Sequence, residues 1–204
     1  MRAIPAILFS IGAIAASISF VPAAVAQADQ AEASETTLTP LPERDEVVVL
    51  IASYEGDWVA RGTTRTNFND PLEAASCRMS SVFDAATQTL SNDGRCASTQ
   101  RALELQGDLS VTPEGELDGG YFNRFDVAEL QSSTGTAYEE GFIIEAVYLA
   151  EFGGETQELD AKVSVGRPQQ LENGDTAYSL VIEIVDPDTA ESVVFSELVF
   201  TLRD

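Results

Sequence analysis

The sequence contains no histidine and only one lysine, Lys162, in 204 residues. Without an imidazole there is no serine or cysteine triad with a histidine base, no histidine-ligated zinc or copper, and no histidine-held haem. Asp and Glu are plentiful, but none follows the ligand spacing of a calcium loop. We therefore expect no metal, no cofactor and no catalytic residue, and predict a non-enzymatic chain; an enzyme is the third choice and would require two carboxylates that converge in a cleft.

Positive charge is also scarce. Lys and Arg together number 11 against 34 Asp and Glu, which gives a formal net charge of −23. Proteins bind nucleic acid through clusters of Lys and Arg that neutralise phosphates. This composition predicts no nucleic-acid partner, and a carboxylate-rich surface that keeps the protein soluble.

Residues 1–26 have the layout of a secretory signal. Arg2 is followed by a long apolar stretch, then Pro22, and then the small-x-small sequence Ala24-Val25-Ala26. We predict cleavage after Ala26, a periplasmic or secreted protein, and no membrane span after cleavage. Removing 26 of the 204 residues leaves 178, a length that suits one domain.

The chain after the signal divides into two parts. Residues 27–46 are rich in Ala, Glu, Thr and Pro without an apolar period, which predicts a disordered acidic leader. Residues 47–204 are predicted to form a single β-barrel domain. Its first segment, residues 47–51, is a β-branched apolar run that fits either a short strand or a helical turn over a barrel end.

The two cysteines lie on neighbouring predicted strands. In an antiparallel hairpin with its turn within residues 84–89, opposed residues have numbers that sum to 173, so Cys77 faces Cys96. Opposed antiparallel positions are close enough for a disulfide, and an exported protein meets an oxidising compartment. We predict a Cys77–Cys96 disulfide with a structural role.

Period-two alternation continues from residue 56 to the C-terminus. Further hairpins are predicted around residues 112–115, around Gly153-Gly154, and between strands near residues 176–185 and 191–202. About nine strands with short connections predict an all-β chain. The expected fold is an up-and-down antiparallel β-barrel of about 8–10 strands, with a β-sandwich as the alternative.

Two short motifs carry a resemblance. Gly56-Asp57-Trp58 opens the first strand and Arg203 closes the last, which resembles the signature of the lipocalin, fatty-acid-binding and avidin-like barrels grouped as calycins. The resemblance implies a cation–π contact between Arg203 and Trp58 at one barrel end. The segment Gly94-Arg95-Cys96-Ala97-Ser98 also resembles the corresponding segment of a group of exported bacterial proteins. This resemblance implies no particular activity.

Three sets of residues are candidates for binding. Arg78 and Arg95 are opposed on the face away from the disulfide; they either pair with surface acids or clamp a carboxylate or phosphate. The apolar residues Ile143, Val147 and Leu149 face outward and predict a surface covered either by residues 47–51 or by a partner or second copy. Inside the barrel, either a packed core or an apolar ligand cavity is expected, lined by Trp58, Tyr121, Phe142 and Tyr148.

These features favour an exported binder of a small apolar or amphipathic ligand in the cell envelope. The alternative is an envelope protein–protein interaction or structural module with a packed barrel interior. The first predicts an enclosed site reached from one barrel end, and the second predicts a filled interior with an exposed apolar patch.

Overall fold

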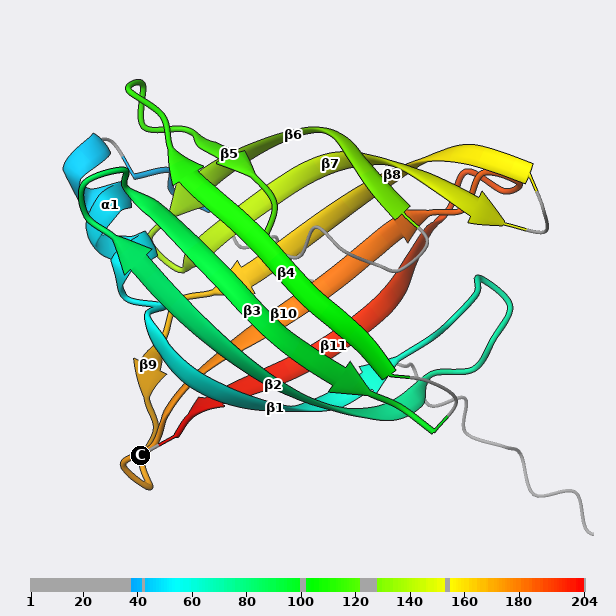
Figure 1. The fold of residues 1–204 in the computed structure, drawn as a ribbon, viewed down its shortest axis with the longest axis horizontal. Helices are drawn as coiled ribbons and strands as arrows, with labels where there is room; N and C mark the ends of the chain where they lie inside the picture. The colour runs from blue at the N-terminus through cyan, green and yellow to red at the C-terminus, as the bar shows by residue number, and fades with distance from the viewer. Residues whose placement is uncertain (1–37, 42, 100–101, 122–127, 153–154, 204) are drawn as a thin grey trace, which may run out of the picture. The chain divides into compact units, whose positions relative to one another are not determined.

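The computed structural model describes residues 38–41, 43–99, 102–121, 128–152 and 155–203. Ten antiparallel strands close into a barrel, and the short strand β9 pairs with the outer end of β10 (Figure 1). The strands are β1 (Gly56–Thr64), β2 (Glu73–Asp84), β3 (Thr89–Ala97), β4 (Ala102–Val111), β5 (Leu117–Gly119), β6 (Ala128–Tyr138), β7 (Gly141–Phe152), β8 (Glu155–Gly166), β9 (Gln169–Gln170), β10 (Thr176–Val185) and β11 (Ser192–Leu202).

The barrel closes between its first and last strands. β1 pairs with β11 along its length, from Trp58 opposite Leu202 to Thr64 opposite Ser196. Other neighbours follow chain order, apart from the step from β8 to β10. Because closure removes unpaired sheet edges, it satisfies the backbone groups of the two terminal strands. The predicted all-β, up-and-down barrel is confirmed, and the sandwich alternative is not observed.

The predicted hairpin registers are confirmed. Cys77 lies opposite Cys96 and Arg78 opposite Arg95 across β2 and β3. Across β7 and β8, Phe142 faces Val165. These registers follow from alternation, since a slip of one residue would turn every apolar side chain of a strand toward water.

One long strand was not predicted. β6 has only small residues, Gly135 and Ala137, among its fully buried positions, and its sequence is rich in Ser and Thr. Such a segment lacks the apolar alternation by which a strand is recognised. β6 pairs with β7 over most of its length but with β5 only at Leu117 and Gly135, so the contact between β5 and β6 is short.

The segment that precedes β1 is a helix, α1 (Arg44–Ala52). Val47, Leu50 and Ile51 share one helical face at spacings of three and four and are buried in the barrel core. Figure 1 shows α1 at one end of the barrel, beside the turn that joins β2 to β3. Of the two structures predicted for residues 47–51, the helical turn at a barrel end is the one observed.

The predicted leader differs from the structure at its C-terminal edge. α1 begins at Arg44, within residues 27–46, and Pro40 forms a bridge with Tyr138 of β6. The Leu41 N–H donates to the Ala137 carbonyl oxygen at 3.0 Å. Backbone hydrogen bonds to an existing strand fix this stretch although its own composition is polar. The predicted signal peptide and the rest of the leader lie outside the described residues.

Candidate functional site in the barrel

The interior nearest α1 holds a cluster of six aromatic side chains, here called the aromatic plug. Tyr54 is at its centre, with ring centroids 5.3 Å from Phe142 and 5.2 Å from Tyr178, both edge to face. Such arrangements are favoured by the ring quadrupoles and add to the burial of apolar area. The plug consists of Tyr54, Trp58, Tyr121, Phe142, Tyr178 and Phe200, and all six are buried.

Hydrogen bonds satisfy the polar atoms of the plug. The Trp58 Nε1–H donates to the Tyr54 carbonyl oxygen at 2.8 Å, and the Tyr54 hydroxyl donates to the Gly166 carbonyl oxygen at 2.9 Å. The Tyr121 and Tyr178 hydroxyl oxygens are 2.7 Å apart. Desolvation by burial raises the pKa of Tyr54, Tyr121 and Tyr178 above the ordinary tyrosine value. The plug is therefore neutral at physiological pH.

The four predicted lining residues all face inward but do not form one site. Trp58, Tyr121 and Phe142 belong to the plug, where they pack on one another and on other rings. Tyr148 is six residues beyond Phe142 on β7, about 20 Å along the strand. Burial raises the pKa of Tyr148 to about 12. The plug fills the end of the barrel near α1, and Tyr148 belongs to the other half.

The predicted contact between Trp58 and Arg203 is not confirmed. Arg203 is exposed, and its backbone N–H donates to the Asp57 carbonyl oxygen at 2.8 Å. The Trp58 indole contacts the Tyr178 ring edge to face at 4.7 Å. Among the described residues, the structure records no contact between the Arg203 guanidinium and this indole.

Two polar side chains face the interior beside the plug. Ser81 on β2 and Asn92 on β3 are directly opposed, and both are buried. Asn92 Nδ2–H donates to the Tyr121 carbonyl oxygen at 3.1 Å, whereas Ser81 Oγ and Asn92 Oδ1 have no hydrogen-bond partner among the described residues. The sequence analysis missed this pair, although the same register that joins the cysteines places both residues on the disulfide face.

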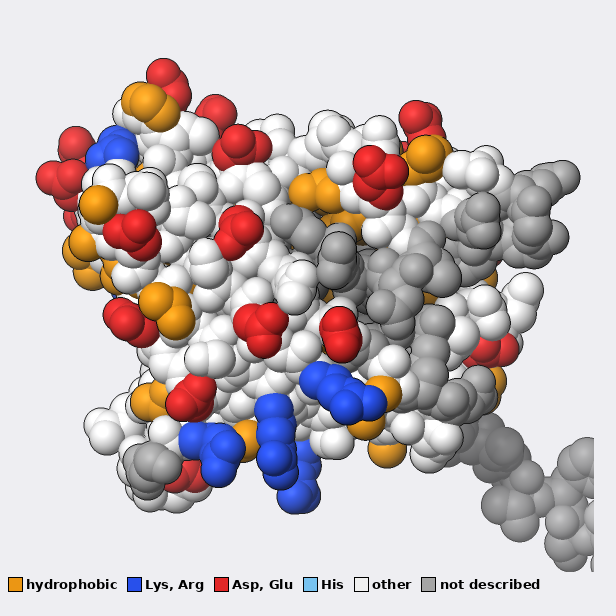
Figure 2. Space-filling model, viewed as in Figure 1, with side chains coloured by type: hydrophobic (Ala, Val, Ile, Leu, Met, Phe, Trp, Pro, Cys, Tyr) orange, Lys and Arg blue, Asp and Glu red, His pale blue; other side chains and the backbone are white. Residues whose placement is uncertain are grey.

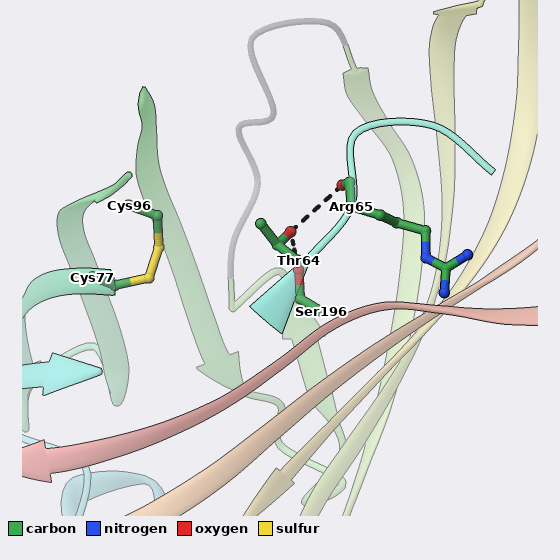
Figure 3. Close-up of a disulfide and its surroundings, with 5 residues drawn as sticks. All are labelled: Thr64, Arg65, Cys77, Cys96 and Ser196. Carbon is green, nitrogen blue, oxygen red and sulfur yellow. Dashed lines mark hydrogen bonds between the residues drawn. A yellow bond between two sulfur atoms is a disulfide. The ribbon is translucent and has the colours of Figure 1, made fainter. Parts of the chain in front are cut away.

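The barrel end away from α1 contains the disulfide, which is confirmed (Figure 3). Nearby, the Thr64 and Ser196 hydroxyl oxygens are 2.8 Å apart across β1 and β11. Arg65 follows Thr64 and donates from Nη1 to the Phe68 carbonyl oxygen at 3.1 Å, while its buried Nε–H has no partner within the described chain. This end is more polar than the plug.

The apolar residues predicted on the outer face of β7 are half-buried there. Ile143 lines a surface groove with Leu38 and Val181, and Val147 lines a second groove with Val185. α1 does not cover them, because its apolar side chains are buried in the core. Residues 47–51 therefore do not cover the outer face of β7, as one of the two predictions had it. Leu38, from the segment beside β6, contributes to the groove around Ile143. Leu149 lines neither groove.

No helix in the described ranges is both long and apolar enough to cross a membrane. Within the same ranges, no group of three Cys, Asp or Glu side chains is placed to hold a metal ion.

The chain was compared with protein-family models and with curated proteins. No family model matches it, and no curated protein is similar to it in sequence. The closed ten-stranded antiparallel barrel is consistent with a calycin-like fold, whereas membership of the lipocalin or avidin type stays a prediction. The chain is a closed antiparallel β-barrel with an aromatic plug inside it, beside which the Ser81 Oγ and Asn92 Oδ1 atoms have no hydrogen-bond partner among the residues described.

Proposed function

We propose that the protein binds a small amphipathic ligand inside the barrel and catalyses no reaction on it. The supporting observation is the opposed pair Ser81 and Asn92, whose Oγ and Oδ1 atoms are buried and find no hydrogen-bond partner in the part of the chain that the structure describes. A buried polar atom without a partner costs about 1–3 kcal/mol. A ligand group placed between the two residues would remove this cost for both atoms.

The two atoms select the chemistry of that group. Asn92 Oδ1 is an amide carbonyl oxygen and can only accept a hydrogen bond, while the Nδ2 group of the same side chain donates to the Tyr121 carbonyl oxygen. Ser81 Oγ can donate as well as accept. A ligand hydroxyl fits both, since it donates to Asn92 and accepts from Ser81. A carboxylate would bring no proton for Asn92 Oδ1, so we infer a neutral alcohol.

The surroundings select the rest of the ligand. Leu90 and Leu109 are fully buried, and the inward neighbour of Ser81 on β2 is Met79. Apolar walls with a few placed polar groups are typical of sites for small organic ligands. The ligand is thus an alcohol with an apolar body. The disulfide agrees with the proposed location in the cell envelope, where thiols are oxidised.

Native mass spectrometry of protein purified from its own host tests this proposal. We expect a retained small molecule on the wild-type chain and its loss from the S81A/N92L variant. Ser80 and Asp93 are the next opposed pair and face outward, so S80A/D93N is a matched control that should keep the ligand.

Ordered water is the competing occupant, since water commonly satisfies buried polar atoms. Fluorescence of Trp58 separates the two, because it reports binding of an added long-chain alcohol beside the plug. A wild-type chain that carries no small molecule and whose fluorescence does not respond to that alcohol would overturn the proposal.

A second candidate function is an envelope protein–protein interaction through the outer face of β7. It is favoured by the two grooves that Ile143 and Val147 line. In this case Val147→Asp should abolish a complex seen by light scattering, while Glu145→Gln on the same face should not. A wild-type protein that stays monomeric and captures no envelope protein would exclude it.

A further inference from the structure

Three arginines form a row across the outer face of β1, β2 and β3. Arg78 and Arg95 are directly opposed on β2 and β3. Arg61 on β1 is opposite Ser76, two residues from Arg78 on the same face. All three are exposed, because their strand neighbours Ala60, Cys77 and Cys96 point into the core. We call Arg61, Arg78 and Arg95 the arginine row.

The row is unexpected in a protein with a formal net charge of −23. Like charges directly opposed in a sheet destabilise it, and acids are abundant enough to neutralise each arginine. Yet within the described part of the chain none of the three guanidinium groups has a hydrogen-bond or ion-pair partner, even though Glu104 is opposite Arg95. Figure 2 shows basic side chains gathered over β1 to β3 at the lower edge of a face that is otherwise mostly acidic.

We propose that the arginine row binds a phosphate monoester. Cα atoms of opposed residues are about 5 Å apart, so the Arg78 and Arg95 guanidinium groups can reach one anion from both sides. Each guanidinium offers a fork of N–H donors, and a phosphate monoester has three acceptor oxygens and close to two negative charges at neutral pH. A carboxylate has one charge and two oxygens and would leave donors of the two forks unused.

The charge of the whole protein favours a small soluble ligand over a phospholipid surface. The acidic exterior repels an extended anionic bilayer over the Debye length, about 8–10 Å at physiological salt. A single small dianion meets mainly the local field of the three arginines. This inference concerns the outer wall and does not depend on the alcohol site inside the barrel.

Calorimetric titration with glycerol phosphate at low ionic strength tests the proposal. The R78Q/R95Q variant should bind at least about tenfold more weakly than wild type, since it loses two charge-assisted contacts. R61Q should show a smaller loss, because Arg61 is offset from the opposed pair. K162Q/R167Q removes the same charge from exposed residues elsewhere and should bind as wild type does. The interior variant S81A/N92L should also bind normally.

Four outcomes would overturn the inference. They are no binding of glycerol phosphate to wild type, an equal loss in K162Q/R167Q, equally tight binding of succinate, and binding to phosphatidylglycerol vesicles without binding to the soluble ester. Circular dichroism of R78Q/R95Q should match wild type, because both side chains point into solvent. A change in the phosphorus NMR signal of glycerol phosphate on adding the protein, lost in R78Q/R95Q alone, would support the inference.

Discussion

The hydroxyl oxygens of Tyr121 and Tyr178 lie 2.7 Å apart, although 57 residues separate the two tyrosines in sequence. Tyr121 lies just after β5 and Tyr178 lies in β10, so their contact crosses the barrel interior. Both side chains are buried in the plug, so this hydrogen bond forms away from solvent. It links two opposite parts of the wall that share no backbone pairing.

Replacing one of these tyrosines tests that link. Tyr178→Phe should lower the free energy of unfolding by about 1–2 kcal/mol, because the Tyr121 hydroxyl loses this partner. The double variant Y121F/Y178F should cost less than the sum of the two single changes. Urea unfolding of the four proteins measures the coupling, and strictly additive costs would contradict a direct bond.

The Cys77–Cys96 disulfide should contribute about 3 kcal/mol to stability, from the loop-closure entropy of a sequence separation of 19. We expect C77A/C96A to fold into the same barrel with a lower urea midpoint. Opposed strand residues already hold the two positions in register, so far-ultraviolet circular dichroism should not change. Loss of the β-sheet signal in C77A/C96A would contradict this expectation.

Alkaline pH should destabilise the barrel through its buried tyrosines. Their pKa values are raised in the folded state, so above about pH 10 the unfolded chain releases protons that the folded chain retains. The stability that these tyrosines contribute is fully present below pH 10. Above it, the free energy of unfolding falls by about 1.4 kcal/mol per pH unit for each such tyrosine.

Tyr148→Phe provides the control for this pH effect, since burial raises the pKa of Tyr148 to about 12. The variant should lose stability less steeply than wild type between about pH 10 and 12, by one tyrosine's share. Urea unfolding at a series of pH values measures the slope. If the pH dependence of the unfolding free energy were unchanged in Tyr148→Phe, the pKa of Tyr148 would not be raised in the folded protein.

Helix α1 offers a matched pair of substitutions. Ile51 is 0% exposed and packs in the barrel core, whereas Val49 is 71% exposed on the opposite side of the helix. Ile51→Ala should cost about 2–5 kcal/mol, and Val49→Ala should stay within about 0.5 kcal/mol. Similar costs for both would show that α1 does not close the barrel end through its buried face.

Closure of the barrel should depend on Gly62. A Cβ atom at this position would overlap the carbonyl oxygen of Glu197 on β11, so the two strands approach too closely for a side chain. Gly62→Ala should therefore destabilise the barrel by about 1–3 kcal/mol. Thr63→Ala, on the adjacent residue, should have a much smaller effect. Thermal unfolding of both variants distinguishes a local clash from a general weakness of β1.

Sequence reasoning worked best where a turn fixes a register. A hairpin turn sets the sum of opposed residue numbers, so one turn was enough to place Cys77 against Cys96 and Arg78 against Arg95. The same register also places Ser81 against Asn92, a pair whose importance appears only in the structure, where both side chains are buried and Ser81 Oγ and Asn92 Oδ1 have no partner within the described ranges. Sequence reasoning failed for β6, because the buried residues of this strand are too small to give an apolar pattern.

The sequence by itself determined the strands with alternating apolar residues, the disulfide, the acidic surface and the absence of histidine chemistry. These depend on residue type and on contacts between neighbours in the chain. Only the tertiary structure decided that Tyr54 and Tyr178 join Trp58, Tyr121, Phe142 and Phe200 in one plug, and that Arg61 continues the row of Arg78 and Arg95. Those groupings require the curvature and closure of the sheet, which bring distant strands together and which no local pattern encodes.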